Sequence, residues 1–233
     1  DELAGSVLSI AEALTNIVWA PMPDGIRSIS LSANWMWPCN NEGEDARLYR
    51  AVKAASDFAI ALGINIPTGK DSLSMKQKYP DREVLAPGTV IISAAGHCHD
   101  IRSVVEPVFR KDGGPIYYLN LSGDTHKLGG SSFAQVLGKV GKEAPTVKDP
   151  ENFGRAFDAL QECIREGRIL AGHDVASGGL ITTLLEGCFA NPGVGADIDL
   201  SPLGEPDMIR VLFAENAGVV IQAGDETVEK VFR

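Results

Sequence analysis

The stretch GHDVASGGL, residues 172–180, marks the point where a short apolar strand is followed by an apolar helix. The strand is predicted over residues 169–173 and the helix over residues 179–190. Strands that alternate with helices of this length indicate an α/β layer. In open α/β sheets, ligands bind beyond the carboxyl ends of the strands, and Asp174 is predicted to lie at such an end. The segment therefore predicts a fold class together with a ligand-binding position.

The glycine-rich half of this stretch has two interpretations. Ser177, Gly178 and Gly179 precede a helix, whose free amides and dipole favour phosphate, and small residues let a ligand approach the backbone closely. The alternative is an ordinary capped helix with Ser177 as the N-cap. The pattern alone leaves both open. Of the four histidines, His173 is of interest only because it adjoins Asp174.

The remaining pattern predicts two α/β domains, residues 1–105 and 114–233, with a boundary in the polar, turn-rich segment at residues 105–114. Hydrophobic periodicity predicts two helices and two strands in the first domain, at residues 4–19, 26–33, 44–62 and 88–97. Beyond the boundary, strands and helices alternate to the end of the chain. The predicted fold is therefore a two-domain α/β (α+β) architecture.

Composition excludes several classes of protein. The chain has 233 residues, 44% hydrophobic and 22% charged, which is enough to bury a sizeable core. It contains no run of about 18 apolar residues that would predict a membrane span. The net charge of −10, without clustered Lys or Arg, argues against a nucleic-acid partner. Four scattered cysteines fit reduced thiols, so we expect a cytoplasmic protein.

A carboxylate and an amide lie one helical turn apart in EALTN, residues 12–16. Residues four apart on a helix share a face, so Glu12 and Asn16 can both reach one hard cation. Mg²⁺ takes carboxylate and carbonyl oxygens and keeps several waters, so two ligands from one helix suit it. Two solvated polar positions are the alternative, and the spacing does not decide between them.

Two further segments are predicted to be loops that could bind a phosphate, another anion or a metal. In TGKDSLSM, residues 68–75, Lys70 follows a glycine and precedes an aspartate, a group that can hold phosphate or metal. The segment lacks the Gly-x-x-x-x-Gly-Lys pattern of a Walker loop, and a turn with a solvated lysine is the alternative. In LSGDTHKLGGSS, residues 121–132, paired glycines indicate either an anion nest or a plain turn.

Six motifs taken together resemble a known family. In chain order they are EALTN, LSANW, GEDARLY, PTGKDSLSM, HDVASGG and LFAENAGVVIQ, at residues 12–16, 31–35, 43–49, 67–75, 173–179 and 212–222. Their order resembles the large, single-chain form of phosphoribosylformylglycinamidine synthase, and within it the second of the two homologous halves of the synthetase region. The resemblance covers nearly the whole chain.

The resemblance implies a fold and an activity. Each half of that enzyme has an aminoimidazole ribonucleotide synthetase-like N-terminal domain, whose strands close a barrel with a counterpart half, followed by a C-terminal α/β domain. The enzyme converts formylglycinamide ribonucleotide, ATP and glutamine into formylglycinamidine ribonucleotide, ADP, phosphate and glutamate in purine biosynthesis. ATP activates the amide oxygen, and ammonia from a separate glutaminase domain displaces the phosphate.

The resemblance also implies site residues. It places Mg²⁺ ligands at Glu12, Asn16 and Asp174, with ATP or ADP as the nucleotide and a nucleotide contact at Ala176. Lys70 is implied as a phosphate or substrate contact. Many relatives read His-Asp-x-Ser-Asp-Gly-Gly, whereas this chain has alanine and serine where they have serine and aspartate. A backbone contact is therefore what remains at Ala176.

Several expectations concern what surrounds the chain. By resemblance it is a piece of a longer polypeptide with a truncated N-terminal domain, because the strands before EALTN and the glutaminase domain are missing. We therefore expect no glutaminase or amidine-forming activity from this chain alone, and we expect the remaining domains as partners. Without the counterpart half, the sheet that contains strands 26–33 and 88–97 is expected to present an unpaired edge and an apolar face, which predicts a homodimer or a looser aggregate that buries residues of both strands.

Two alternative functions stay open. In the large enzymes the halves are pseudo-equivalent, and one cleft holds an auxiliary nucleotide that is not turned over. The altered HDVASGG loop fits such a non-catalytic half. The chain also has features in common with other ATP-dependent kinases and synthetases of the same superfamily, although the pairing of EALTN with LSANW disfavours them.

Overall fold

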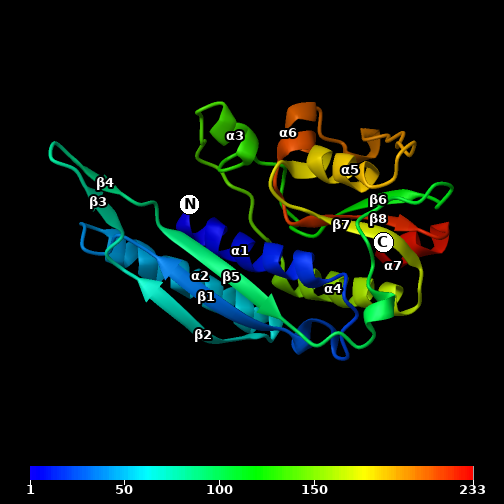
Figure 1. The fold of residues 1–233 in the computed structure, drawn as a ribbon, viewed down its shortest axis with the longest axis horizontal. Helices are drawn as coiled ribbons and strands as arrows, with labels where there is room; N and C mark the ends of the chain where they lie inside the picture. The colour runs from blue at the N-terminus through cyan, green and yellow to red at the C-terminus, as the bar shows by residue number, and fades with distance from the viewer. Residues whose placement is uncertain (233) are drawn as a thin grey trace.

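The structure, a computed structural model, describes residues 1–232 and contains two three-stranded sheets with helices between and around them (Figure 1). The strands are β1 (Ser30–Met36), β2 (Asn65–Ser72), β3 (Lys76–Lys78), β4 (Glu83–Leu85), β5 (Thr89–Ala95), β6 (Ile116–Asn120), β7 (Ile169–Val175) and β8 (Gly218–Ala223). The helices are α1 (Glu2–Ile17), α2 (Glu44–Leu62), α3 (Ser132–Val136), α4 (Pro150–Arg165), α5 (Gly179–Phe189), α6 (Met208–Phe213) and α7 (Glu229–Phe232), with short 3₁₀ turns at Gly25–Ser28, Ile101–Ser103, Ser201–Leu203 and Glu226–Val228. Within residues 1–232, no helix is both long enough and apolar enough to cross a membrane.

The first sheet has the strand order β2-β1-β5 and is covered on one face by α1 and α2. Leu31, Ala33 and Trp35 of β1 are buried, and the residues between them are partly exposed. This alternation is the period-2 pattern of a half-buried strand. The connection from β1 through α2 to the parallel strand β2 is a β-α-β crossover. The open face is the one turned away from the helices.

One predicted boundary in this sheet is wrong. The strand predicted at residues 26–33 begins at Ser30 and is the central strand β1, paired with β2 and β5, so the expected unpaired edges are those of β2 and β5. Residues 25–28 form a 3₁₀ turn instead. The open face is mixed, because alternation and register place Ser32, Asn34 and Ser93 there together with the half-exposed Ile91, and Lys70 lies opposite Asn34.

The segment TGKDSLSM is also not a loop over its first half. Residues 68–72 lie within β2 and pair in parallel with β1. Gly69, which suggests a turn in the sequence, is needed here for a different reason. A Cβ at Gly69 would lie 2.1 Å from the carbonyl oxygen of Ala33 on the neighbouring strand, so only glycine permits this close approach of the two backbones.

The second sheet, β6-β8-β7, is antiparallel throughout. Its central strand β8 is buried at every residue. On one face, Val219 and Ile221 join a core cluster with Phe153 and Leu160 of α4. On the other face, Val220 packs in a smaller cluster that includes Leu180 of α5. The second sheet is therefore enclosed by helices on both sides.

The larger core cluster runs across both sheets, so α1 packs against structure from each half of the chain. The fully buried Gln161 of α4 accepts a hydrogen bond from Met22 N (2.8 Å) and donates to the carbonyl oxygens of Val18 and of Ala20 (3.1 Å). A Cβ on Gly172 of β7 would clash with the ring of Trp19. These contacts fix the end of α1 relative to α4 and to β7.

Candidate functional site

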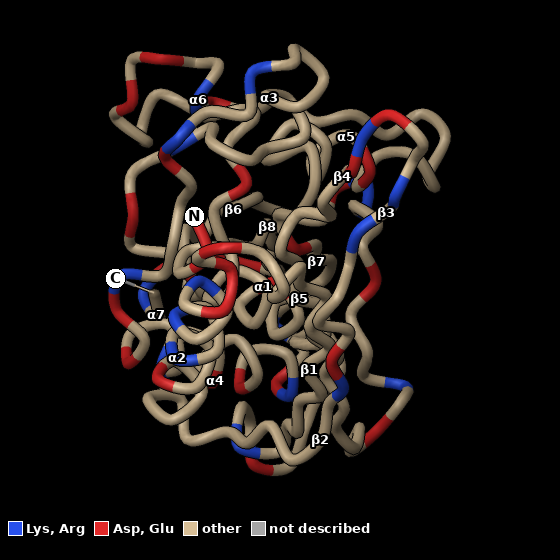
Figure 2. Tube along the Cα trace, turned by 90° about the vertical axis from the view of Figure 1, so that its left-hand side faces the viewer, with Lys and Arg blue, Asp and Glu red and all other residues tan. Residues whose placement is uncertain are grey.

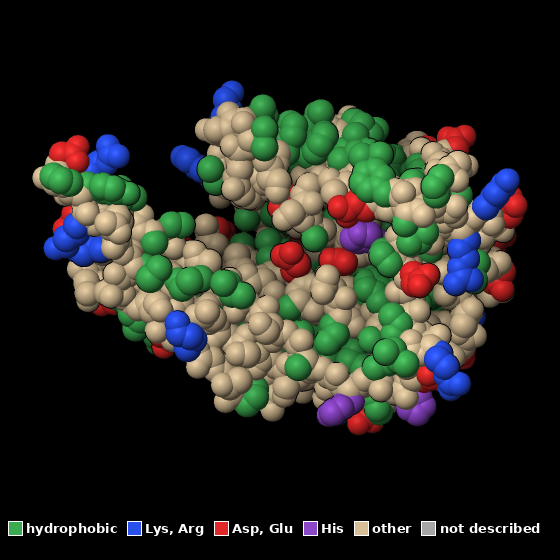
Figure 3. Space-filling model, viewed as in Figure 1, with side chains coloured by type: hydrophobic (Ala, Val, Ile, Leu, Met, Phe, Trp, Pro, Cys, Tyr) green, Lys and Arg blue, Asp and Glu red, His purple; other side chains and the backbone are tan. Residues whose placement is uncertain are grey.

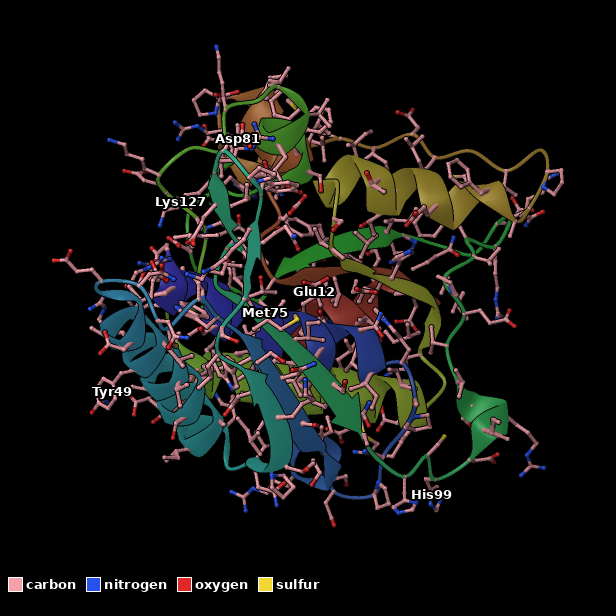
Figure 4. All side chains as sticks on the ribbon, turned by 60° about the vertical axis from the view of Figure 1, so that its left-hand side comes forward. Glu12, Tyr49, Met75, Asp81, His99 and Lys127 are labelled. Carbon is pink, nitrogen blue, oxygen red and sulfur yellow. The ribbon has the colours of Figure 1, made fainter. Side chains whose placement is uncertain are left out.

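A cavity of about 540 Å³ opens where α1 passes between β5 of the first sheet and β7 of the second, and we call it the strand cavity. Its walls include Glu12 and Asn16 from α1, Asp174 and Ala176 from the end of β7, and Val90–Ala94 of β5. Glu12 lies near the middle of the molecule in this region (Figure 4). Residues that are far apart in the sequence therefore line one cavity.

The α1 wall follows from the amphipathic pattern of the helix. Asp1 caps the helix by accepting hydrogen bonds from two backbone amides of the first turn, which stabilises its start. Ile10 and Leu14 are fully buried in the core, whereas Glu12 and Asn16 are exposed. Residues four apart share a face, so burying the apolar stripe turns both oxygen-bearing side chains toward the strand cavity.

The β7 wall places Asp174 one residue before the strand ends. Asp174 is 6% exposed, and its carbonyl oxygen accepts a hydrogen bond from the Thr183 hydroxyl of α5 at 3.0 Å. His173 Nδ1 lies 3.4 Å from Asp174 Oδ1, and its Nε2 lies 3.0 Å from Glu186 Oε2. The contact with Asp174 raises the pKa of His173 above its ordinary value. Figure 3 shows acidic side chains gathered beside a histidine near the centre of this face.

Electrostatics at Glu12 favour a cation. Partial burial raises the pKa of the Glu12 carboxyl, and the neighbouring carboxylates of Asp174 and Glu215 raise it further. Within residues 1–232 the Glu12 carboxylate has no hydrogen bond or ion pair to offset this repulsion. A hard cation would supply the missing positive charge, and carboxylate and amide oxygens are the ligands that Mg²⁺ takes. The residues present therefore fit a magnesium ion.

The donor set is not a closed metal cage. Over the described part of the chain, no three His, Cys, Asp or Glu side chains lie close enough to enclose a metal ion by themselves. Mg²⁺ normally keeps several waters and is held by one or two carboxylates together with substrate phosphates. An open set of protein oxygens is therefore the arrangement expected for a metal that arrives with a nucleotide.

A second, smaller cavity of about 260 Å³ lies on the other side of Glu12 and Ala176, which line both spaces; we call it the loop cavity. Glycine-rich residues 129–131 and Lys127 form part of its wall, and Glu215 forms another part. Lys127 Nζ is 2.8 Å from Asp124 Oδ2. Figure 4 shows Lys127 at the edge of the molecule, away from the central position of Glu12.

Comparison with known proteins identifies the family. The model for the AIR synthase related protein, C-terminal domain, matches residues 111–233, more than half of the chain. The chain belongs to the AIR synthase-related family. The model for the FGAR-AT PurM_N-like domain matches residues 1–97, and the two matches do not overlap.

Curated members of the family are similar over the whole of this chain. It is 38% identical over 236 residues to phosphoribosylformylglycinamidine synthase of Homo sapiens, covering 100% of this chain and 17% of the relative. It is 37% identical over 234 residues to the probable chloroplastic/mitochondrial phosphoribosylformylglycinamidine synthase of Arabidopsis thaliana, covering 99% and 16%. The chain thus spans about a sixth of the length of these relatives.

A solved structure confirms the fold. PurL of Thermotoga maritima complexed with FGAR matches with a TM-score of 0.69 at 15% identity, covering 99% of this chain and 36% of that chain. At that identity the likeness establishes the family's fold: mixed helix and strand content, with an N-terminal and a C-terminal unit of the AIR synthase type.

The family's implied site residues are thus partly assembled. Glu12, Asn16, Asp174 and Ala176 line the strand cavity together. Lys70 is not brought to either cavity; it lies on β2, exposed, with its Nζ 3.1 Å from Ser72 Oγ.

Two features around the site were not predicted from the sequence. Ser177 is not the N-cap of α5, because Gly178 occupies that position in the left-handed conformation without a side-chain cap. Sequence reasoning also missed Glu215, which lies in the LFAENAGVVIQ motif and lines the loop cavity. Its signal was present as a lone carboxylate just before the apolar strand β8.

The charge pattern agrees with a small, metal-bearing ligand. Lys and Arg are spread over the molecule among Asp and Glu and do not gather on one face (Figure 2). The lining of the strand cavity contains carboxylates and no Lys, Arg or His. A polyphosphate there would need a divalent cation to offset the repulsion from Glu12 and Asp174.

Proposed function

We propose that this chain is part of an ATP-dependent, glutamine-dependent ligase of purine biosynthesis that converts formylglycinamide ribonucleotide into formylglycinamidine ribonucleotide. Within that enzyme it supplies a Mg²⁺-nucleotide site. The observation that carries the proposal is the convergence of Glu12, Asn16 and Asp174 on one cavity. The identity of 38% to the human enzyme of that name supports the reaction class.

The chain's own residues would act by binding and orienting. Glu12, Asn16 and Asp174 would hold the ion through oxygen atoms, and Ala176 would meet the nucleotide through its backbone because its methyl group offers no hydrogen bond. The bound Mg²⁺ would neutralise phosphate charge. The Thr183 hydroxyl, which bonds the carbonyl oxygen of Asp174, would hold that residue's backbone in place.

A second candidate is a half that holds an auxiliary nucleotide without turning it over. The observation that favours it is the lining of the strand cavity, which includes no Lys, Arg or His that could stabilise charge developing on a transferred phosphoryl group. The replacement of a serine by Ala176 acts in the same direction. In this version the site stabilises the domain arrangement by mass action, as any ligand of the folded state does.

Binding of ADP to this chain, measured by calorimetry with Mg²⁺ and with excess chelator, tests the nucleotide site. We expect binding with Mg²⁺ and a loss of about tenfold or more in Asp174→Asn and Glu12→Gln, because each removes a charged oxygen ligand. Glu151→Gln, an exposed carboxylate on α4 outside both cavities, is the control and should bind as the wild type does. Equal ADP affinity with and without Mg²⁺ would contradict the assignment.

An assay of ATP turnover separates the two candidates. Incubation with Mg²⁺ and ATP, followed by measurement of ADP release, should give no turnover if the site only holds its nucleotide. Turnover that requires the remaining domains would favour the catalytic version.

The surroundings of the site are proposals of the same kind. We propose a division into domains at residues 105–114, a cytoplasmic location, and the glutaminase and other synthetase domains as partners. Lys70, on the open face of the first sheet, is assigned to a substrate contact there. The unpaired edges β2 and β5 of that sheet are where a counterpart half, or a second copy in a homodimer, would add strands.

A further inference from the structure

Glu215 occupies a position between two loops that form the walls of the loop cavity. Its Oε1 accepts hydrogen bonds from Ser132 N and from Gly178 N, both at 2.8 Å. Ser132 starts α3 directly after the glycine-rich residues 129–131, and Gly178 belongs to the loop that follows β7. One carboxylate oxygen therefore joins two segments that are distant in the sequence.

The loop on the β7 side needs such a contact. Gly178 and Gly179 have φ angles of +93° and +75°. Glycine adopts positive φ about as readily as negative φ, so these two residues do not by themselves hold the loop in this conformation. A Cβ at Gly179 would lie 2.7 Å from the carbonyl oxygen of Leu212, so the segment that leads to Glu215 already packs against this loop. The hydrogen bond from Gly178 completes the attachment.

Glu215 also faces the site itself. It lines the loop cavity together with Glu12 and Ala176, and its charge acts on the Glu12 carboxyl. Its second oxygen, Oε2, has no hydrogen-bond partner within residues 1–232. The hydrogen bonds of Oε1 both come from backbone amides of the two loops, which is the bonding of a residue that holds loops in place.

We propose that Glu215 is a positioning residue of the nucleotide site: through one oxygen it holds the 129–132 loop and the 176–179 loop at a fixed separation, and so places Ala176 and the end of β7. This inference rests on the proposed Mg²⁺-nucleotide function. Residues that orient a metal site from outside it commonly change metal affinity by about 10- to 100-fold when they are replaced.

Two variants separate positioning from charge. Glu215→Gln keeps an oxygen that can accept both amides but removes the negative charge, whereas Glu215→Ala removes both. We expect Glu215→Ala to bind MgADP about 10- to 100-fold more weakly than the wild type, and Glu215→Gln to stay within about threefold. Amide exchange in the ligand-free protein should rise at Ser132 and Gly178 in Glu215→Ala alone.

Asp149→Ala is the matched control. The Asp149 carboxylate also accepts a backbone amide, from Asn152 at the start of α4, but it lines neither cavity. This variant should lose stability and keep its MgADP affinity, which shows that local destabilisation does not account for the effect at Glu215.

The outcomes are distinguishable. MgADP affinity in Glu215→Ala equal to that of the wild type overturns the inference and leaves the proposed function standing. Glu215→Gln as weak as Glu215→Ala also overturns it, because charge would then be responsible. A wild-type chain that binds no MgADP overturns the proposed function, and the inference with it, even if exchange at the two amides behaves as expected.

Discussion

The two sheets of the molecule differ in how they are covered, and the difference shows where its rigidity comes from. The second sheet has α4 on one face and α5 on the other, and β8 is buried at every residue. The first sheet has helices on one face only, and most of β2 is exposed. The strand cavity lies where they meet, so its β7 wall is built on the enclosed sheet and its β5 wall on the open one.

The largest expected effect is on the free energy of unfolding, and it is tested by replacing one isoleucine in each sheet. Ile221 of β8 is fully buried, so Ile221→Ala should cost about 2–5 kcal/mol of unfolding free energy through lost packing and a residual cavity. Ile91 of β5 is 49% exposed on the open sheet, and Ile91→Ala should change stability by about 0.5 kcal/mol or less. Urea unfolding of both variants measures this. Similar losses would mean that the open face is covered in solution.

The second prediction concerns the junction of the two halves. Gln161→Ala leaves the amide of Met22 and the carbonyls of Val18 and Ala20 without this partner in a buried region, which should cost about 1–3 kcal/mol. Gln135→Ala is the matched control, because the exposed Gln135 makes one hydrogen bond, to the carbonyl oxygen of Gly130. Thermal unfolding should separate the two variants clearly. A Gln161→Ala chain as stable as Gln135→Ala would mean that the halves are held together by packing alone.

The enclosed sheet could be predicted from the sequence better than the open one. The strand predicted at 169–173 and the helix predicted at 179–190 begin as predicted, and each ends within two residues of its predicted end. Residues 68–72 could not be recognised as a strand, because their pairing partner lies across the β-α-β crossover and Gly69 is there for backbone clearance. Local propensity contains no information about such a contact.

The site residues also divide into those that could be predicted from the sequence and those that could not. The face shared by Glu12 and Asn16, and the place of Asp174 at the end of a strand, follow from periodicity and could be predicted. Glu215 could not, because its importance depends on Ser132 and Gly178, which only the fold brings to it. The roles of these residues in binding remain predictions.

The smallest expected effect on MgADP affinity and stability is that of replacing Lys70 on the open sheet. By family resemblance this residue contacts phosphate or substrate. Lys70 lies exposed on β2, outside both cavities, so Lys70→Ala should leave MgADP affinity within about twofold and stability within about 0.5 kcal/mol. Lys127→Ala is the informative control, because Lys127 lines the loop cavity and pairs with Asp124, whose side chain is 5% exposed. Removing it leaves a largely buried carboxylate with a weaker partner, Lys148 at 4.0 Å, and should lower stability measurably. If calorimetry shows a tenfold loss of MgADP affinity in Lys70→Ala, the open sheet must close over the nucleotide, and its exposed face would then belong to the site.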